Sequence, residues 1–314
     1  MAGSSYQEDG QVCQENSHCG VVALLGRPNV GKSTLLNRIL EQKISIVSHK
    51  AQTTRQRVLG IFSRPGFQAV FADTPGIMQP HNKLQEYMVQ ASMRAVSGAD
   101  LSLVIVDATG QSHPEDKSLF ERLATLRGRR LLAINKIDLV EQKNLLLPRI
   151  AEYSAAGLFE EIIPVSALTG QGVDLLLDKI AANLPQGQFL YDEQQIAVQP
   201  LRFFAAELIR ETLYEMLHEE LPYATAVGIE EYREHSEKGR KTYIQALIYA
   251  ERDSQKAIII GRAGSMLKRI GRAARVKIEE MAGEPVYLEL RVKVMEKWRA
   301  NQSFLRMVGY TKDN

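Results

Sequence analysis

Residues 26–33 read GRPNVGKS and match G-x-x-x-x-G-K-S, the pattern of a loop that binds phosphate groups. An apolar run at 21–25 precedes the loop, and a helical pattern at 33–40 follows it. This is the context that the motif requires, because backbone N–H groups at the start of the helix then point at the phosphate. A chance Gly-rich turn is the alternative, and the flanking patterns argue against it.

The chemistry of the loop gives its polar residues separate roles. Lys32 is expected to reach the β- and γ-phosphates of a nucleotide, and the Ser33 hydroxyl to hold Mg²⁺. Gly26 and Gly31 leave room for the backbone to approach the ligand. The predicted phosphate-binding residues of the loop are Gly26, Asn29, Val30, Gly31, Lys32, Ser33 and Thr34.

Length and composition suggest two globular domains. The chain has 314 residues, of which 45% are hydrophobic and 24% are charged, so ordinary cores can form. The net charge of +2 does not indicate a class of partner. Two cysteines, Cys13 and Cys19, suit a reducing compartment, and together with His18 they lack the spacing of zinc ligands.

Neither a secretory signal nor a membrane span is predicted. The first residues lack a basic start followed by an apolar run, and no stretch of about 18 apolar residues occurs. We therefore expect a cytoplasmic protein.

Short apolar runs alternate with helical patterns over the first two thirds of the chain. Residues 1–19 carry three acids and no Lys or Arg, and are predicted to be a disordered tail. Strands are expected at 21–25, 58–62, 69–72, 101–106, 131–134 and 162–165, and helices at 91–97, 117–126 and 173–183. The alternation predicts an α/β domain over 20–185 with a mostly parallel sheet, followed by a polar linker over 186–200.

The pattern changes after the linker. A long amphipathic helix is expected at 201–221, strands at 223–231 and 242–252 with a turn at 234–239, helices at 254–260 and 265–281, and a last strand at 286–294. The order α-β-β-α-α-β over 201–314 predicts a second domain of the α+β class.

A second motif, Asp73-Thr74-Pro75-Gly76, follows the strand expected at 69–72. A carboxylate at the end of that strand can hold the water shell of Mg²⁺, and the N–H of Gly76 can sense the γ-phosphate. Asp73 as a simple helix cap is the alternative, and the position directly after a strand argues against it.

A third motif, Asn135-Lys136-Ile137-Asp138, predicts that the base is guanine. The Asp138 carboxylate can accept hydrogen bonds from N1–H and the 2-amino group of guanine, whereas adenine would leave it unpaired. The apolar stem of Lys136 can lie along the base, and Ser166-Ala167 can offer a backbone N–H to guanine O6. GTP and GDP are therefore the expected ligands, with Asn135 in the same site.

Hydrolysis also requires a threonine that closes over Mg²⁺ and the γ-phosphate. Thr53 and Thr54 both lie between the phosphate loop and Asp73, and the pattern leaves open which of them binds the metal. The candidate metal ligands are Ser33, Thr54 and Asp73, and the candidate catalytic residues are Lys32, Thr54 and Gly76. Residues 45–57 are predicted to form a switch that orders with GTP and loosens with GDP.

Two side chains bear on the rate of hydrolysis. Many such enzymes orient the attacking water with a Gln after the Asp-x-x-Gly segment, but this chain has Ile77 there. We expect slow intrinsic hydrolysis, or a water held by backbone groups and the metal. Arg55 is a candidate arginine finger, although a solvated surface arginine is the favoured interpretation.

Residues 261–264 form a G-x-x-G loop between two helical segments, as in KH domains that clamp single-stranded RNA. Seven basic residues and no acid lie between 256 and 277, whereas 207–237 holds nine acids. A solvated helix face is the alternative to a nucleic-acid surface. The predicted RNA-binding residues are Ile260, Gly261, Arg262, Ala263, Gly264, Lys268, Arg269 and Arg272.

Taken together, the motifs resemble those of the Era family of GTPases, which act in assembly of the small ribosomal subunit. The matching segments are GRPNVGKS at 26–33, KAQTTR at 50–55, DTPG at 73–76, NKID at 135–138 and the G-x-x-G loop at 261–264. The resemblance covers about residues 20–314, and the apolar Ile77 also fits this family.

The resemblance implies a type II KH domain that binds the 3′ end of 16S ribosomal RNA and assists maturation of the 30S subunit. It implies that GTP, with Mg²⁺, favours the RNA-competent state and that hydrolysis to GDP promotes release. It also implies K⁺ beside the phosphates at Asn29, and a loose peripheral association with the inner membrane. We further expect a monomer.

Two other functions are weighed against this one. A GTP-driven partner in tRNA modification would need a catalytic cluster in 201–314, where only His218 and His235 stand out. A membrane-remodelling switch would need a lipidation site or a basic amphipathic helix.

Overall fold

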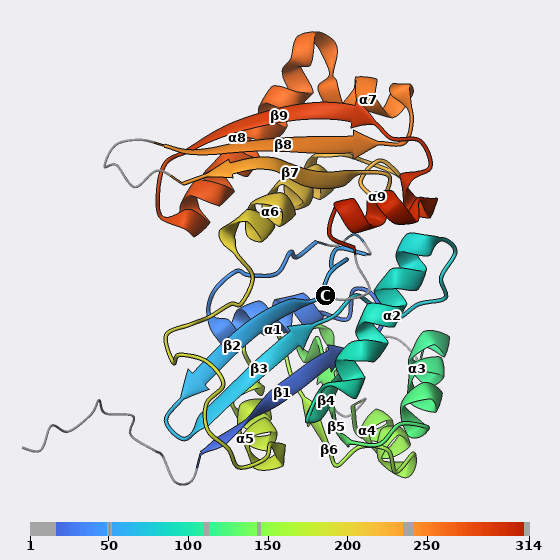
Figure 1. Ribbon diagram of the computed structural model, residues 1–314. Helices are drawn as coiled ribbons and strands as arrows, with labels where there is room; N and C mark the ends of the chain where they lie inside the picture. The colour runs from blue at the N-terminus through green and yellow to red at the C-terminus, as the bar shows by residue number, and fades with distance from the viewer. Residues whose placement is uncertain are drawn as a thin grey trace, which may run out of the picture.

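The computed structural model describes residues 17–48, 50, 52–109, 113–142, 146–234 and 241–310. Two sheets lie in separate halves of the molecule, and helix α6 (Leu201–Met216) lies between them (Figure 1). The first half contains the phosphate loop, and the second half contains the G-x-x-G loop.

The larger sheet has six strands in the order β2-β3-β1-β4-β5-β6. The strands are β1 (His18–Leu25), β2 (Val58–Arg64), β3 (Phe67–Asp73), β4 (Leu101–Asp107), β5 (Arg129–Asn135) and β6 (Glu161–Pro164). Only β2 runs antiparallel to its neighbour, so the predicted, mostly parallel α/β sheet is confirmed. The residues that follow β1, β3, β5 and β6 therefore meet at one edge of the sheet.

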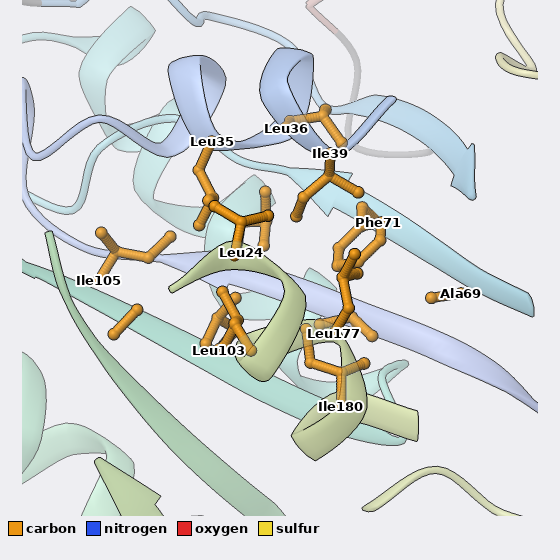
Figure 2. Close-up of a cluster of buried hydrophobic side chains, with 14 of the residues drawn as sticks. Leu24, Leu35, Leu36, Ile39, Ala69, Phe71, Leu103, Ile105, Leu177 and Ile180 are labelled. Carbon is orange, nitrogen blue, oxygen red and sulfur yellow. The ribbon is translucent and has the colours of Figure 1, made fainter. Parts of the chain in front are cut away.

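Helices cover both faces of this sheet because its strands are apolar on both sides. Leu24 of β1 belongs to one core and Leu25 to the other. On one face, α1 (Lys32–Leu40) and α5 (Val173–Asn183) place Leu35 and Leu177 over the strands (Figure 2). The other face is covered by α2 (Lys83–Ser97), α3 (Pro114–Ala124) and α4 (Leu146–Ala155).

The helices predicted at 117–126 and 173–183 are present, and the one predicted at 91–97 begins earlier, at Lys83. Its N-cap is Asn82, whose side chain accepts a hydrogen bond from the N–H of Gln85, a cap signal that the apolar pattern did not include. Helix α4 was not predicted, because an exposed Leu147 and the following proline disturb its apolar periodicity.

The segment predicted as a linker, 186–200, is bound to the first sheet along most of its length. Its backbone pairs with β2, where the N–H of Ile61 donates to the carbonyl of Ile196 at 2.8 Å. The side chain of Gln68 in β3 accepts from the N–H groups of Leu190 at 2.8 Å and Tyr191 at 3.1 Å. These contacts fix the point at which the second half of the chain begins.

The smaller sheet has the order β7-β8-β9. Strand β7 (Ala226–Arg233) is antiparallel and β9 (Val286–Val294) is parallel to the central β8 (Thr242–Ala250). Helices α6, α7 (Asp253–Ile260) and α8 (Ser265–Ala282) share one core with the sheet. The predicted order α-β-β-α-α-β is confirmed, except that α6 ends at Met216 rather than at 221.

The sequence patterns missed the elements after β9. A short helical turn (Trp298–Ala300) and α9 (Gln302–Met307) follow, and α9 lies beside α2 of the first half (Figure 1). Trp298 is fully buried in a cluster with Phe304, Tyr310 and two residues of α2, Tyr87 and Met88. The C-terminal segment therefore joins the two halves.

One boundary differs from the prediction. The disordered tail was expected to reach residue 19, but His18 and Cys19 belong to β1, and the His18 Nδ1 atom lies 2.8 Å from the carbonyl oxygen of Leu184. Residues 1–16, with Cys13, and most of the turn predicted at 234–239 lie outside the described residues.

Candidate nucleotide and RNA sites

The phosphate loop has a backbone that only a few residue types can adopt. Gly26 has φ 150°, Asn29 has φ 64° and Gly31 has φ 99°. A Cβ at Gly31 would lie 2.3 Å from Nδ2 of Asn135, and one at Gly26 would lie 2.4 Å from the carbonyl oxygen of Ile105. Both glycines are therefore required by positive φ and by a close approach, as the motif predicted.

Lys32, the first residue of α1, is buried beneath the loop. Its Nζ donates to the carbonyls of Gly26 and Arg27, both at 3.0 Å. Burial lowers the pKa of Lys32 to about 8, although the nearby Asp73 carboxylate acts in the opposite direction. Phosphate oxygens at this position would favour the charged ammonium, so the site is electrostatically suited to an anion.

Three of the predicted metal ligands come together. The Ser33 hydroxyl donates to Oδ2 of Asp73 at 2.7 Å and lies 2.9 Å from Oγ1 of Thr54. Asp73 is fully buried, and burial raises the pKa of its carboxyl group. Its Oδ1 atom has no hydrogen-bond partner among the described residues, which is costly unless a cation or a water completes the site.

These donors fit Mg²⁺ rather than a softer metal. A hydroxyl and a carboxylate are hard oxygen ligands, and Mg²⁺ completes its octahedron with water and phosphate oxygens. No group of three His, Cys, Asp or Glu side chains that could hold a metal occurs in the described part of the chain. Thr54, rather than Thr53, is the threonine whose hydroxyl faces Ser33.

The predicted base-recognition residues gather at the ends of β5 and β6. Asn135 connects two loops, because its Nδ2 donates to the carbonyl of Val30 at 2.8 Å and its Oδ1 accepts from the N–H of Ala167 at 2.9 Å. The Ser166 hydroxyl donates to Oδ1 of Asp138 at 2.6 Å and so orients this carboxylate. The predicted residues are thus brought together by two strand ends.

A cleft of about 960 Å³ joins the phosphate and base positions. Its lining includes Asn29, Gly31, Lys32, Ser33, Thr34, Thr54, Gly76, Asn135, Lys136, Asp138 and Ala167. This volume suits a nucleotide. Tyr214 and Glu215 of α6 also line the cleft, a contribution from the second half of the chain that no motif indicated.

The segment after Asp73 has no side chain at position 77 that could orient a water. Gly76 packs against Pro28, where a Cβ would lie 2.7 Å from the ring. Ile77 is only 5% exposed, and its N–H donates to the carbonyl of Gly26 at 3.1 Å. Its side chain therefore belongs to the core and cannot position a water.

The predicted switch, residues 45–57, contacts α6 at several points. Nζ of Lys50 donates to the carbonyl of Tyr214 near the end of α6. The Tyr214 hydroxyl donates to the carbonyl of Gln52 at 3.1 Å, and Arg210 donates to the carbonyl of Thr53. The backbone next to Thr54 is therefore held by the second half of the chain.

Both interpretations of Arg55 are wrong. The side chain is 1% exposed, so it is neither a solvated arginine nor a finger that reaches the nucleotide. Its guanidinium donates to the Thr225 carbonyl at 2.7 Å, the Tyr214 hydroxyl at 3.0 Å, the Tyr223 carbonyl at 3.2 Å and the Pro222 carbonyl at 3.3 Å. Arg55 joins the switch to the segment between α6 and β7.

The same junction contains a buried carboxylate, Glu211 of α6, whose side chain is 1% exposed. It lies 2.7 Å from Nζ of Lys43 and 2.9 Å from Nζ of Lys277, which also contacts Glu215 at 2.6 Å. Burial alone would raise the pKa of Glu211, but the two ammonium groups hold this pKa below its usual value.

This arrangement predicts a pH effect on stability. Because the folded pKa of Glu211 lies below the unfolded value, the carboxylate adds stability above the unfolded pKa of about 4.3, and that stability is lost as the pH falls through the folded pKa. Glu211→Gln should reduce the loss of unfolding free energy between about pH 6 and pH 3 by about 1 kcal/mol, measured by urea denaturation. Glu215→Gln, at a carboxylate that is 46% exposed, should change it by less than half as much. An equal loss of unfolding free energy over this pH range in wild type and Glu211→Gln would contradict the prediction.

The G-x-x-G loop has a conformation that depends on its glycines. Gly261 has φ 71° and a Cβ there would lie 2.7 Å from Cβ of Met266, whereas Gly264 has φ 75° with open space around it. Ala263 between them has φ 51°. Gly264 is the N-cap of α8, so the loop leads directly to a helix N-terminus that favours phosphate.

The apolar residues before the loop divide between core and surface. Ile259 is fully buried, Ile260 is half-buried and Ile258 is 53% exposed. Ile260 was predicted to contact RNA, and Ile258 is the more accessible neighbour that the sequence pattern did not separate from it.

The basic run around the loop is only partly available. Four of its residues are exposed and form no ion pair within the described part of the chain: Arg262, Lys268, Arg269 and Arg272. Lys277, by contrast, is bound to Glu211 and Glu215, and Arg275 lies 3.9 Å from Glu279. The surface that could attract a phosphate backbone therefore covers the first half of α8.

Within the described residues, no helix combines the length and the apolar character needed to cross a membrane.

Family models match both halves of the chain. A model described as "50S ribosome-binding GTPase" matches residues 21–136, and a model of the KH domain matches residues 220–299. GTPase Era of Geobacter metallireducens is 47% identical over 292 residues, which cover 93% of this chain and 97% of that protein. GTPase Era of Lacticaseibacillus paracasei is 45% identical over 297 residues, which cover 94% and 98%.

Two solved structures are similar over nearly the whole chain. A variant of Aquifex aeolicus Era bound to GDP and AlF4⁻ has a TM-score of 0.90 and 40% identity, covering 94% of this chain and 99% of that one. Era in complex with MgGDPNP and nucleotides 1506–1542 of 16S ribosomal RNA gives a TM-score of 0.90, 40% identity and the same coverage, 94% and 99%. The similarity thus includes both sheets and their connection.

Proposed function

The chain belongs to the Era family of GTPases, and we propose that it is a GTP-dependent switch that binds the 3′ end of 16S ribosomal RNA and assists maturation of the 30S subunit. The observation that carries the proposal is one cleft that is lined by the phosphate loop with Ser33, by Thr54, by Asn135, Lys136 and Asp138, and also by α6 of the KH-bearing half.

The proposed hydrolysis step depends on position and charge rather than on a side-chain base. Lys32 and the loop N–H groups would bind the β- and γ-phosphates. Ser33, Thr54 and Asp73 would hold Mg²⁺, which would supply charge neutralisation at the phosphates. With Ile77 in the core, the attacking water would be held by backbone groups such as the N–H of Gly76, so intrinsic hydrolysis is expected to be slow.

Base selection follows from unpaired polar groups. Asp138, oriented by Ser166, would accept from guanine, and adenine would leave this desolvated carboxylate without a donor from the base. The Ala167 N–H donates to Oδ1 of Asn135, so guanine O6 would share this donor with Asn135 or replace it as the acceptor.

RNA binding is assigned to the G-x-x-G loop and the exposed part of the basic run. The loop would hold the RNA backbone at the N-terminus of α8, and Lys268, Arg269 and Arg272 would contact phosphates. The Era complex with 16S nucleotides supports the choice of this RNA.

Coupling between the two sites is expected through the switch and α6. A γ-phosphate and Mg²⁺ would bind Thr54, and the carbonyls of the two residues before it, Gln52 and Thr53, accept hydrogen bonds from Tyr214 and Arg210. These hydrogen bonds connect the switch in the first half to α6 in the second half. The arrangement of the two halves would therefore respond to the nucleotide.

A substitution in the loop tests RNA binding separately from GTP hydrolysis. Gly264→Asp places a carboxylate in open space at the loop, and we expect RNA affinity to fall at least about tenfold while GTP hydrolysis is unchanged. Gly283→Asp is the matched control. Gly283 also has a positive φ, 68°, and open space around it, but it lies at the opposite end of α8. Filter binding with a 16S 3′-end fragment measures both, and equal affinities for the two variants would exclude the clamp.

The identity of the RNA is tested in cells. Crosslinking followed by sequencing of the bound RNA should enrich the 3′ end of 16S ribosomal RNA. Enrichment of tRNA instead would favour the alternative of a tRNA-modification partner, for which the described part of residues 201–314 offers no cluster of His, Cys, Asp or Glu ligands.

Four finer expectations stay predictions. A cytoplasmic location, a monomeric state, loose association with a membrane surface and K⁺ beside Asn29 come from composition, from the motifs or from the family resemblance. Cell fractionation tests the first, sedimentation the second and liposome flotation the third. Hydrolysis rates compared in K⁺ and Na⁺ test the fourth.

A further inference from the structure

Asp107 is a buried carboxylate near the base end of the cleft, and the four nucleotide motifs do not include it. It is the last residue of β4, the strand that lies between β1 and β5. Its side chain is 8% exposed. Strand β4 ends at the same sheet edge as the phosphate loop and the Asn135-Lys136-Ile137-Asp138 motif, so its last side chain lies next to both.

The contacts of Asp107 keep it charged and fixed. Oδ2 accepts from Nζ of Lys136 at 2.6 Å, and Oδ1 accepts from the N–H and the hydroxyl of Thr109 at 2.8 and 2.7 Å. Burial alone would raise the pKa of Asp107, but these donors hold the pKa below its usual value. The carboxylate therefore offers Lys136 a strong, charge-assisted hydrogen bond.

A second ionic contact reaches the phosphate loop. Arg27 lies 3.9 Å from Oδ2 of Asp107 and 3.4 Å from Oδ2 of Asp116, a buried residue of α3. The carbonyl of the same Arg27 accepts a hydrogen bond from Lys32 at 3.0 Å. Asp107 thus stands between the loop that binds phosphate and the loop that reads the base.

The consequence falls on the side chain of Lys136. Its backbone is in the left-handed region with φ 68°, its side chain is 31% exposed, and it lines the cleft. Because the ammonium is held at Asp107, the methylene stem spans the distance between that carboxylate and the backbone of Lys136. A lysine whose side chain is flexible in the free protein would instead lose its conformational entropy when the base binds.

We propose that Asp107 is a positioning residue for the guanine base: it fixes Lys136 before the nucleotide binds, so that the lysine stem forms a preorganised wall for the purine. The inference rests on the proposed nucleotide site and extends it to the end of β4. Preorganisation of this kind lowers the entropic cost of binding and slows dissociation.

The test compares ligands with and without a base. In Asp107→Asn, the dissociation rate of fluorescent GDP should rise about tenfold, because a charge-assisted hydrogen bond to Lys136 is lost. The affinity for inorganic tripolyphosphate, which has no base, should stay within about twofold of wild type. Lys136→Met should raise the GDP dissociation rate by a similar factor, and the double variant should show no further rise.

The control is a substitution of a paired carboxylate on α5. Asp178→Asn removes a carboxylate that also pairs with one cation, Arg64 at 2.7 Å, but lies on α5 away from the cleft lining, and it should leave GDP dissociation unchanged. The inference is overturned if Asp107→Asn releases GDP as slowly as wild type, if tripolyphosphate affinity falls as much as GDP affinity, or if the effects of the two substitutions add. Failure of the wild-type protein to bind GDP would overturn the proposed function, and this inference with it.

Discussion

Asp138→Asn is expected to move the preference of the cleft from GTP to xanthosine triphosphate by about 10³-fold or more. Guanine presents a 2-amino donor, for which the Asp138 carboxylate is an acceptor, whereas xanthine presents an oxygen at the same position. An asparagine amide can donate to that oxygen but would face the guanine amino group with a second donor. Competition between the two triphosphates for the purified protein measures the change.

Ser166→Ala is the companion variant. It removes the hydroxyl that donates to Asp138 at 2.6 Å without altering the acceptor itself. GTP affinity should fall by about tenfold or less, with no gain for xanthosine triphosphate. An Asp138→Asn protein that still preferred GTP would show that this carboxylate does not read the base.

Arg55→Met is expected to lower the free energy of unfolding by about 3 kcal/mol, because buried carbonyls lose a charged hydrogen-bond donor. The methionine fills much of the space but removes the donor to the buried Thr225 carbonyl and one donor to each of the carbonyls of Pro222 and Tyr223. It also removes a guanidinium that lies 5.7 Å from the ring of Trp298 and 5.8 Å from that of Tyr214. Denaturant unfolding, followed in the same buffer for both proteins, gives the difference.

Arg64→Met provides the comparison for a surface arginine. Arg64 pairs with Asp178 at 2.7 Å, but the two side chains are 36% and 64% exposed, so its loss should cost less than about 1 kcal/mol. A similar small loss for Arg55→Met would mean that the junction between the switch and the second half contributes little to stability.

The positions of the candidate nucleotide-binding residues could be predicted from the sequence because the motifs are local. Each motif is a short segment at the end of a strand, and parallel strands bring those ends to one edge without further information. Lys32, Asp73 and Asp138 lie where the motifs require them. The α-β-β-α-α-β order of the second half followed in the same way from periodicity.

The junction between the halves could not be predicted, because it depends on contacts between residues far apart in the chain. The sequence around Arg55 is polar and indicates an exposed arginine, whereas in the fold its guanidinium is bound by the carbonyls of Pro222, Tyr223 and Thr225. Trp298 and α9 follow the last predicted strand without an apolar period long enough to assign, and their partners are on α2. The role of Asp107 was likewise not predicted, because it is the last residue of a buried strand and only its side chain reaches the site.

The central claim, that the γ-phosphate controls RNA binding through α6 and the switch, is tested most directly by one titration. A precursor fragment of the 16S 3′ end is titrated with the protein loaded either with GDP or with a non-hydrolysable GTP analogue, both with Mg²⁺. The contacts of Tyr214 and Arg210 with the switch, and of Arg55 in the switch with Tyr214, predict at least about fivefold tighter binding with the analogue. Equal affinities in the two nucleotide states would contradict it.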